Sequence, residues 1–152
     1  MSSAIAVPVP GLDLLAGPRR GIIFLANVFT NAGAAVVTSR IMQAGTAPKN
    51  IGWGTGTTAA AVADIALQAE AAPTAAGGRT VGTESRVTTS VANDTYQVVG
   101  TVVSGGVLAI TEAGLFDNVA AGSLLIHSVF AALNLNAGDS ISFSFGLKFI
   151  PA

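Results

Sequence analysis

The sequence contains no cysteine and a single histidine, and only 10% of its residues are charged. Without cysteine the chain can form neither a disulfide nor a thiolate metal site, and one histidine cannot supply the usual zinc motifs. The eight carboxylates are scattered singly along the chain and have no calcium-loop spacing. We therefore expect no bound metal ion and no cofactor.

Charge of either sign is scarce. Seven Lys and Arg residues against eight Asp and Glu residues give a net charge of −1, which offers no electrostatic attraction for nucleic acid or for an anionic membrane. Hydrophobic residues make up 51% of the chain. A surface with so few charges is poorly protected against association, so we expect copies of the chain or other proteins to cover much of it. The alternative is an ordinary globule whose hydrophobic count is raised by alanine.

Hydrophobic runs long enough to span a membrane are also missing. Two uncharged segments, Gly21–Ser39 and Asn118–Gly138, approach the roughly 20 residues that a bilayer requires. Polar residues and glycine interrupt both segments, so we expect no transmembrane helix. The N-terminus lacks the basic start and cleavage pattern of a signal peptide.

The first 20 residues are predicted to form an extended arm, followed by a single domain over residues 21–152. Prolines in the arm remove backbone donors and disfavour a helix before them. Its apolar side chains are too many for a solvated tail, so they are predicted to contact a neighbouring subunit, with a strand in the chain's own fold as the alternative. The predicted contact residues are Val7, Val9, Leu12, Leu14 and Leu15.

Helical signals are confined to two segments. Apolar residues over Ile22–Ile41 recur at three- and four-residue steps, which is typical of one face of a helix. Asn31 and Gly33 could divide this helix, and a pair of strands is the alternative, because Val36–Thr38 has strand propensity. A turn or two of helix is also predicted over Val62–Glu70.

The rest of the chain favours β-structure. The clearest strand combines large apolar residues on one face with small or polar residues on the other, in strict alternation. Glycine pairs and Asn-Asp mark the turns between strands. Strands are predicted over Thr80–Val91, Thr95–Ser104, Val107–Phe116, Ser123–Ala131 and, most clearly, Ile141–Phe149. The predicted fold is mainly β, an antiparallel β-sandwich or jelly roll with one or two short helices.

Candidates for catalysis are few. The single histidine, His127, lies in an apolar run, and no carboxylate close in sequence could orient it. We interpret it as a structural or interface histidine. The chain also lacks the G-x-S-x-G pattern of a nucleophile elbow. We therefore predict that the protein is not an enzyme.

A glycine-rich stretch surrounds Trp53, with Gly52, Gly54 and Gly56 at alternate positions. The stretch is superficially similar to a phosphate-binding loop. However, it has neither the Gly-Lys-Ser/Thr ending of a P-loop nor the later third glycine of a dinucleotide fingerprint. We interpret Trp53, Gly54 and Gly56 as a structural loop, with the indole as a core or interface anchor.

Glu112 is a lone carboxylate within a predicted strand that is otherwise apolar. If buried, it needs a partner, and Arg79 or Arg86 is the natural candidate, with Glu70 able to share the network. We predict a structural ion pair among these residues. The alternative is that Glu112 lies on the exposed face of its strand.

Several of these pieces together resemble a group of small tailed-bacteriophage virion structural proteins. The matching pattern runs from about residue 31 to residue 149. Its pieces are Asn31–Gly33, Ile51–Thr58, Ala63–Glu70, a downstream arginine, Ile110–Phe116 and Gly138–Ile141. The resemblance implies either a capsid decoration (cement) protein with a jelly-roll core or a component of the tail, and it implies no catalytic residue.

The first expectation is therefore a cement protein on the outer surface of the phage head. It would be a homotrimer that bridges subunits of the major capsid protein and stabilises the shell against genome pressure. A tail, baseplate or fibre subunit is the second reading. A receptor- or glycan-binding module is the third, although Trp53 and Tyr96 are the only Trp and Tyr available to line its groove.

Overall fold

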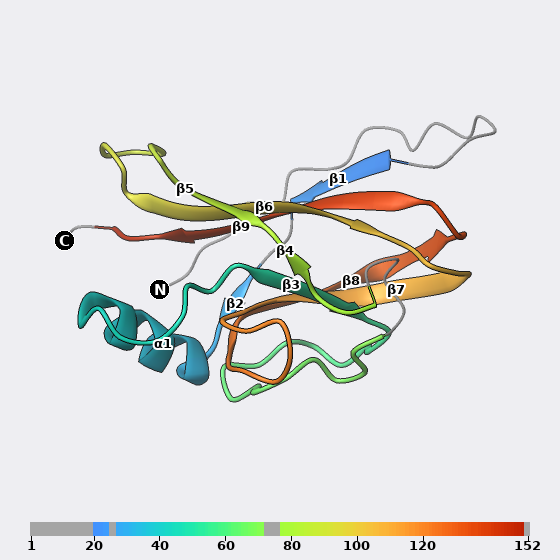
Figure 1. Ribbon diagram of the computed structural model, residues 1–152, viewed down its shortest axis with the longest axis horizontal. Helices are drawn as coiled ribbons and strands as arrows, with labels where there is room; N and C mark the ends of the chain where they lie inside the picture. The colour runs from blue at the N-terminus through green and yellow to red at the C-terminus, as the bar shows by residue number, and fades with distance from the viewer. Residues whose placement is uncertain (1–19, 25–26, 72–76, 151–152) are drawn as a thin grey trace.

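The computed structural model describes residues 20–24, 27–71 and 77–150, which form two facing β-sheets and one helix (Figure 1). The four-stranded sheet has the order β1 (Arg20–Phe24), β9 (Ser140–Lys148), β6 (Thr95–Val103), β5 (Thr83–Val87). The five-stranded sheet has the order β2 (Val28–Phe29), β8 (Leu124–Leu135), β7 (Leu108–Phe116), β3 (Asn50–Gly54), β4 (Thr80–Val81). The prediction of a mainly β, antiparallel sandwich is confirmed, apart from the parallel pairing of β1 with β9.

The core lies between the two sheets. On β9 the alternation expected from the sequence is realised, because every second side chain is buried. These side chains are Ile141, Phe143, Phe145 and Leu147. They share one cluster with Val98 and Val102 of the same sheet and with Ile51 and Trp53 of the facing sheet. The apolar faces of both sheets therefore close on each other, as in other β-sandwiches.

Residues 22–41 differ from the helix that their spacing predicts. The helix α1 covers only Asn31–Ile41, and the residues before it form β1 and β2. Thr30 caps the helix, since its hydroxyl oxygen accepts a hydrogen bond from the N–H of Gly33 at 2.9 Å. The helix prediction is wrong for Ile22–Phe24 and Val28–Phe29, because partners far away in sequence, β9 and β8, supply the hydrogen bonds of that backbone.

The predicted strand Thr80–Val91 is split between the two sheets. Its first residues form β4 and the next ones form β5, with Gly82 at the crossing. A Cβ at Gly82 would lie 2.6 Å from Val98 Cγ1, so only glycine fits where the chain passes from one sheet to the other. The other four predicted strands are confirmed as β6 to β9, with shifted ends.

The second predicted helix, over Val62–Glu70, is also wrong. That segment is irregular and lies against the outer face of the five-stranded sheet (Figure 1). Among the described residues, no helix has the length and apolarity needed to cross a membrane. The predicted arm contacts Val7, Val9, Leu12, Leu14 and Leu15 lie outside the described residues, and β1 begins at Arg20.

Candidate functional site

The outer face of the five-stranded sheet holds a buried cluster of polar side chains, which a β-bulge makes possible. The register between β7 and β8 shifts between Ile110 and Glu112. Strict alternation would place these two side chains on the same face of the strand. The bulge instead leaves Ile110 in the core between the sheets and turns Glu112 to the outer face. There Glu112 is fully buried beneath residues 55–71.

The Glu112 carboxylate binds three backbone N–H groups of the segment that covers it. Its Oε1 accepts from Gly56 at 3.1 Å and from Ala69 at 2.7 Å, and its Oε2 accepts from Gln68 at 3.0 Å. Buried N–H groups need acceptors, and this segment has no helix or sheet to supply them. The carboxylate is that acceptor for Gly56, Gln68 and Ala69, and the last two lie at the end of the predicted helix Val62–Glu70.

His127 links Glu112 to a second carboxylate. The ring is fully buried. Its Nε2 lies 3.0 Å from Glu112 Oε2, and its Nδ1 lies 2.7 Å from Asp64 Oδ2. An ionised carboxylate can only accept a hydrogen bond. Both contacts are therefore hydrogen bonds only when both ring nitrogens carry a proton.

Asp64 closes the network near the surface, where its side chain is 24% exposed. The Ala61 N–H donates to Asp64 Oδ2 at 2.7 Å. This backbone hydrogen bond, assisted by His127 and opposed by partial burial, holds the pKa of the Asp64 carboxyl below its ordinary value. Asp64, His127 and Glu112 thus join the irregular segment to both β7 and β8.

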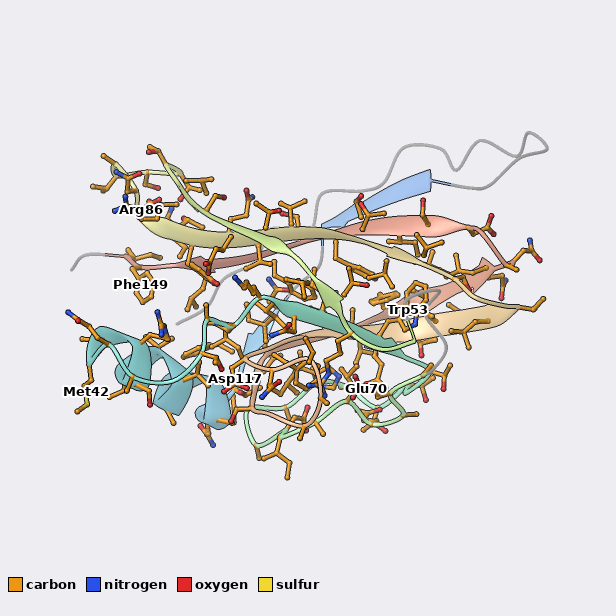
Figure 2. All side chains as sticks on the ribbon, in the orientation of Figure 1. Met42, Trp53, Glu70, Arg86, Asp117 and Phe149 are labelled. Atoms are coloured by element: carbon orange, nitrogen blue, oxygen red, sulfur yellow. The ribbon has the colours of Figure 1, made fainter. Side chains whose placement is uncertain are left out.

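Glycines make room for the cluster. Gly54 pairs with Glu112 across β3 and β7, so both lie on the outer face. A Cβ at Gly54 would collide with Glu112 Oε1 and with the Ala69 carbonyl oxygen. A Cβ at Gly56 would lie 2.7 Å from Glu112 Oε1. Trp53 precedes Gly54 on β3, lies on the inner face and is fully buried in the core (Figure 2). The predicted structural loop is therefore wrong for Trp53 and Gly54, which belong to a strand, and only Gly56 lies in the irregular segment.

A second polar cluster, around Arg79, lies beside the cluster around Glu112. Arg79 forms a bidentate pair with Glu70, with Nε to Oε1 at 2.7 Å and Nη2 to Oε2 at 2.9 Å. Its Nη1 donates to the carbonyl oxygens of Asn118 and Ala121. The guanidinium carbon lies 3.3 Å from the centroid of the Phe116 ring, in a cation–π arrangement. One planar group therefore ties together three loop segments and the end of β7.

The predicted ion pair is wrong in its partners. The side chain that faces Glu112 is the imidazole of His127, and Arg79 binds Glu70 instead. Arg86 is exposed on β5 of the four-stranded sheet, where it pairs with Tyr96 of β6, and it lies far from the cluster (Figure 2). The alternative of an exposed Glu112 is wrong as well, because that side chain is fully buried.

Sequence reasoning missed the pairing of His127 with Glu112, although a signal for it exists. Glu112 precedes the predicted loop Asp117–Gly122 by as many residues as His127 follows it. Residues about equally far from the turn of an antiparallel hairpin lie near each other. Here the two are diagonal neighbours, because Glu112 pairs with Val129 and His127 pairs with Gly114. Asp64 gives no comparable signal, because it lies in an irregular segment whose position follows no periodicity.

The cluster holds the irregular segment in place. Carboxylates contact both nitrogens of His127, so in this arrangement neither ring nitrogen faces a nucleophile. Within the described ranges, no group of three or more His, Cys, Asp or Glu side chains is arranged to bind a metal ion. The network therefore fixes residues 55–71 against β7 and β8.

No protein-family model matches the chain, and no curated protein or solved structure is significantly similar to it. The class of the protein is thus defined by its own geometry. It is a two-sheet β-sandwich in which a buried carboxylate fastens an irregular segment over one sheet.

Proposed function

We propose that the protein is a structural, non-enzymatic subunit of a tailed-phage particle. In this proposal it is a cement protein that sits as a homotrimer on the outer surface of the head and bridges subunits of the major capsid protein. The observation that carries the proposal is an exposed apolar surface at one end of the sandwich. The rigid scaffold behind that surface supports it.

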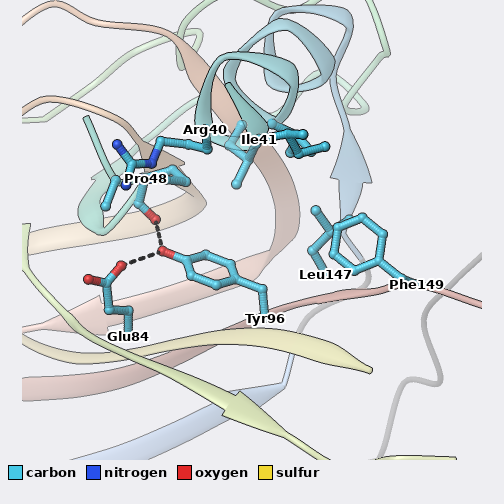
Figure 3. Close-up of a pocket in the computed structure, with 10 residues that line it drawn as sticks. Arg40, Ile41, Pro48, Glu84, Tyr96, Leu147 and Phe149 are labelled. Atoms are coloured by element: carbon cyan, nitrogen blue, oxygen red, sulfur yellow. Dashed lines mark hydrogen bonds between the residues drawn. The ribbon is translucent and has the colours of Figure 1, made fainter. Parts of the chain in front are cut away.

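This surface, which we call the apolar end, consists of the exposed residues Ile41, Met42, Phe149 and Ile150 and the groove that Ile41 and Phe149 line (Figure 3). Ile41 is 78% exposed and Ile150 is 69% exposed. Contiguous exposed apolar patches mark interaction sites on soluble proteins. The chain has few charged side chains to oppose association through this surface. The simplest interpretation is that another protein subunit covers the surface in an assembly.

The two polar clusters, around Glu112 and around Arg79, also favour a structural role. A cement protein contributes by adding buried interface between shell subunits, so its own fold has to remain folded while the shell is under pressure. Glu112 and Arg79 fasten the longest irregular segment of the described chain to the sheet below it. Both nitrogens of His127 are engaged in that task, which leaves the ring without the open position that general-base chemistry requires.

A deletion of residues 1–19 tests the proposal, because it removes the predicted arm and leaves β1 intact from Arg20. The truncated protein is expected to fold but to be absent from purified phage particles, as measured by mass spectrometry of the particles and circular dichroism of the isolated variant. A second variant, Leu14→Asp with Leu15→Asp, keeps the length of the arm and removes its apolar character. Unchanged occupancy of both variants on particles would contradict an arm-mediated structural role.

A further inference from the structure

We propose that the groove at the apolar end binds the N-terminal arm of a second copy of this chain. Leu12, Leu14 and Leu15 of the arm would fill the groove, and Asp13 would lie beside Arg40. The inference rests on the proposed function and names the partner that covers the apolar end.

The groove is a cavity of about 330 Å³ between α1 and the ends of β6 and β9 (Figure 3). Its apolar lining is formed by Val37, Ile41, Pro48, Leu125, Leu147 and Phe149. A pocket of this size and character matches the volume of a few aliphatic side chains. A short leucine-rich segment is therefore a suitable occupant.

The polar groups of the groove leave one cation for an incoming acid. The Tyr96 hydroxyl bonds with the Pro48 carbonyl at 3.0 Å and with Glu84 at 3.1 Å, so these groups are occupied. Among the described residues, Arg40 has no carboxylate partner, and its hydrogen bonds to Ala44 and Gly45 use only Nη1. A guanidinium has five N–H donors and favours bidentate binding of a carboxylate. The rim of the groove can therefore accept one acid.

The arm has the complementary pattern. In residues 1–19 the only acidic residue is Asp13, and leucines lie on both sides of it. An acid between apolar residues is the arrangement that an apolar groove with one cation selects. The same arm carries no other carboxylate that could compete for Arg40.

The position of β1 assigns the arm to a second copy. Arg20 pairs with Ser140 at the start of β9, whereas the groove lies near Phe149, beyond its end. Leu147, the groove residue nearest to Ser140 along β9, lies about 23 Å from it. Even fully extended, the chain from Arg20 back to Leu14 spans about 21 Å. Leu14 and Leu15 therefore fall short of their own groove, while a neighbouring copy can be placed to receive them.

Such an exchange gives each copy one donated arm and one filled groove. A head-to-tail contact of this kind closes into a ring when the rotation between copies permits it. A three-membered ring would satisfy every groove, in keeping with the homotrimer of the proposed function.

The absence of native cysteine allows a direct test by disulfide crosslinking. Ala16→Cys would be introduced into one copy, next to the leucines, and Ala47→Cys into another, at a groove-lining position. The full-length variants would be mixed, oxidised and separated on a denaturing gel. Ala109→Cys, an exposed alanine on β7, is the matched control in place of the groove cysteine.

A covalent dimer of the Ala16→Cys and Ala47→Cys chains, with little product from the control mixture, is the expected result. Two outcomes would overturn the inference: equal crosslinking of the control, or no crosslinking in either mixture. A chain carrying both Ala16→Cys and Ala47→Cys should form linked multimers, and an internally linked monomer would equally overturn it. If crosslinking fails while the protein still occupies phage heads, the inference alone is wrong, and the proposed function stands.

Discussion

Glu112 and His127 show how one pair of buried side chains can organise a long irregular segment. The carboxylate binds three backbone N–H groups and one imidazole nitrogen. Each of these donors is costly to bury without an acceptor. The sequence predicts that a buried Glu112 needs a cationic partner, but it does not identify which one. Arg79 and His127 are both available, and only the position of the irregular segment decides between them.

Replacing Glu112 with alanine is expected to destabilise the protein strongly. The change leaves an imidazole and three N–H groups without their acceptor, which costs about 3–5 kcal/mol in the free energy of unfolding. Urea denaturation followed by circular dichroism measures this cost. Lys49→Ala is the control, because its ion pair with Glu84 is solvent-exposed and contributes less than about 1 kcal/mol. Equal losses in the two variants would contradict the structural role of Glu112.

Among the elements, β9 was predictable because its side chains alternate between the core and the opposite face. β6 to β8 were predictable because glycine pairs and other turn residues bound their apolar runs. β1 was not, because its hydrogen bonds come from β9, whose residues lie more than a hundred positions away. The bulge in β7 was also not predictable, since it inserts a residue without changing the composition of the strand. The candidate site depends on that bulge.

Gly54 provides a test of the packing between β3 and the segment above it. Gly54→Ala is expected to lower the free energy of unfolding by about 1–3 kcal/mol, because the added methyl group would overlap Glu112 and the backbone of Ala69. Gly106→Ala is the matched control, since a Cβ there would meet nothing within 4 Å. Thermal or urea denaturation of both variants gives the comparison. A Gly54→Ala protein as stable as the control would refute the close packing.

The turn between β5 and β6 is organised by Asp94. Its carboxylate accepts the N–H groups of Thr89 at 2.8 Å, Ser90 at 2.8 Å and Val91 at 3.0 Å. Burial opposes ionisation, but these backbone bonds outweigh it and hold the pKa of Asp94 well below its ordinary value of 3.8. A lowered folded-state pKa stabilises the fold above the ordinary Asp pKa, and this contribution is lost as the pH falls below it.

Asp94→Asn is therefore expected to destabilise the protein most at neutral pH. The difference in unfolding free energy between the two proteins should shrink as the pH is lowered from about 7 to about 3, through the ordinary range of an aspartate. Urea titrations at several pH values measure that difference. A gap that stays constant over this range would contradict the assigned role of the carboxylate.

At the scale of the whole molecule, the β-sandwich carries an exposed apolar end that we expect a neighbouring copy to cover. The wild-type chain is expected to be a trimer in solution, and the protein lacking residues 1–19 a monomer, because the groove loses its occupant. Size-exclusion chromatography with light scattering measures both masses. A trimer that survives the deletion would place the contact between copies somewhere other than the arm.

Electron cryo-microscopy of the purified phage particle tests whether the protein is a trimeric cement protein of the head. We expect density for three β-sandwiches around a common axis, repeated at regular positions on the outer surface of the head, between capsid subunits. Density confined to the tail, or absent from the particle, would contradict it.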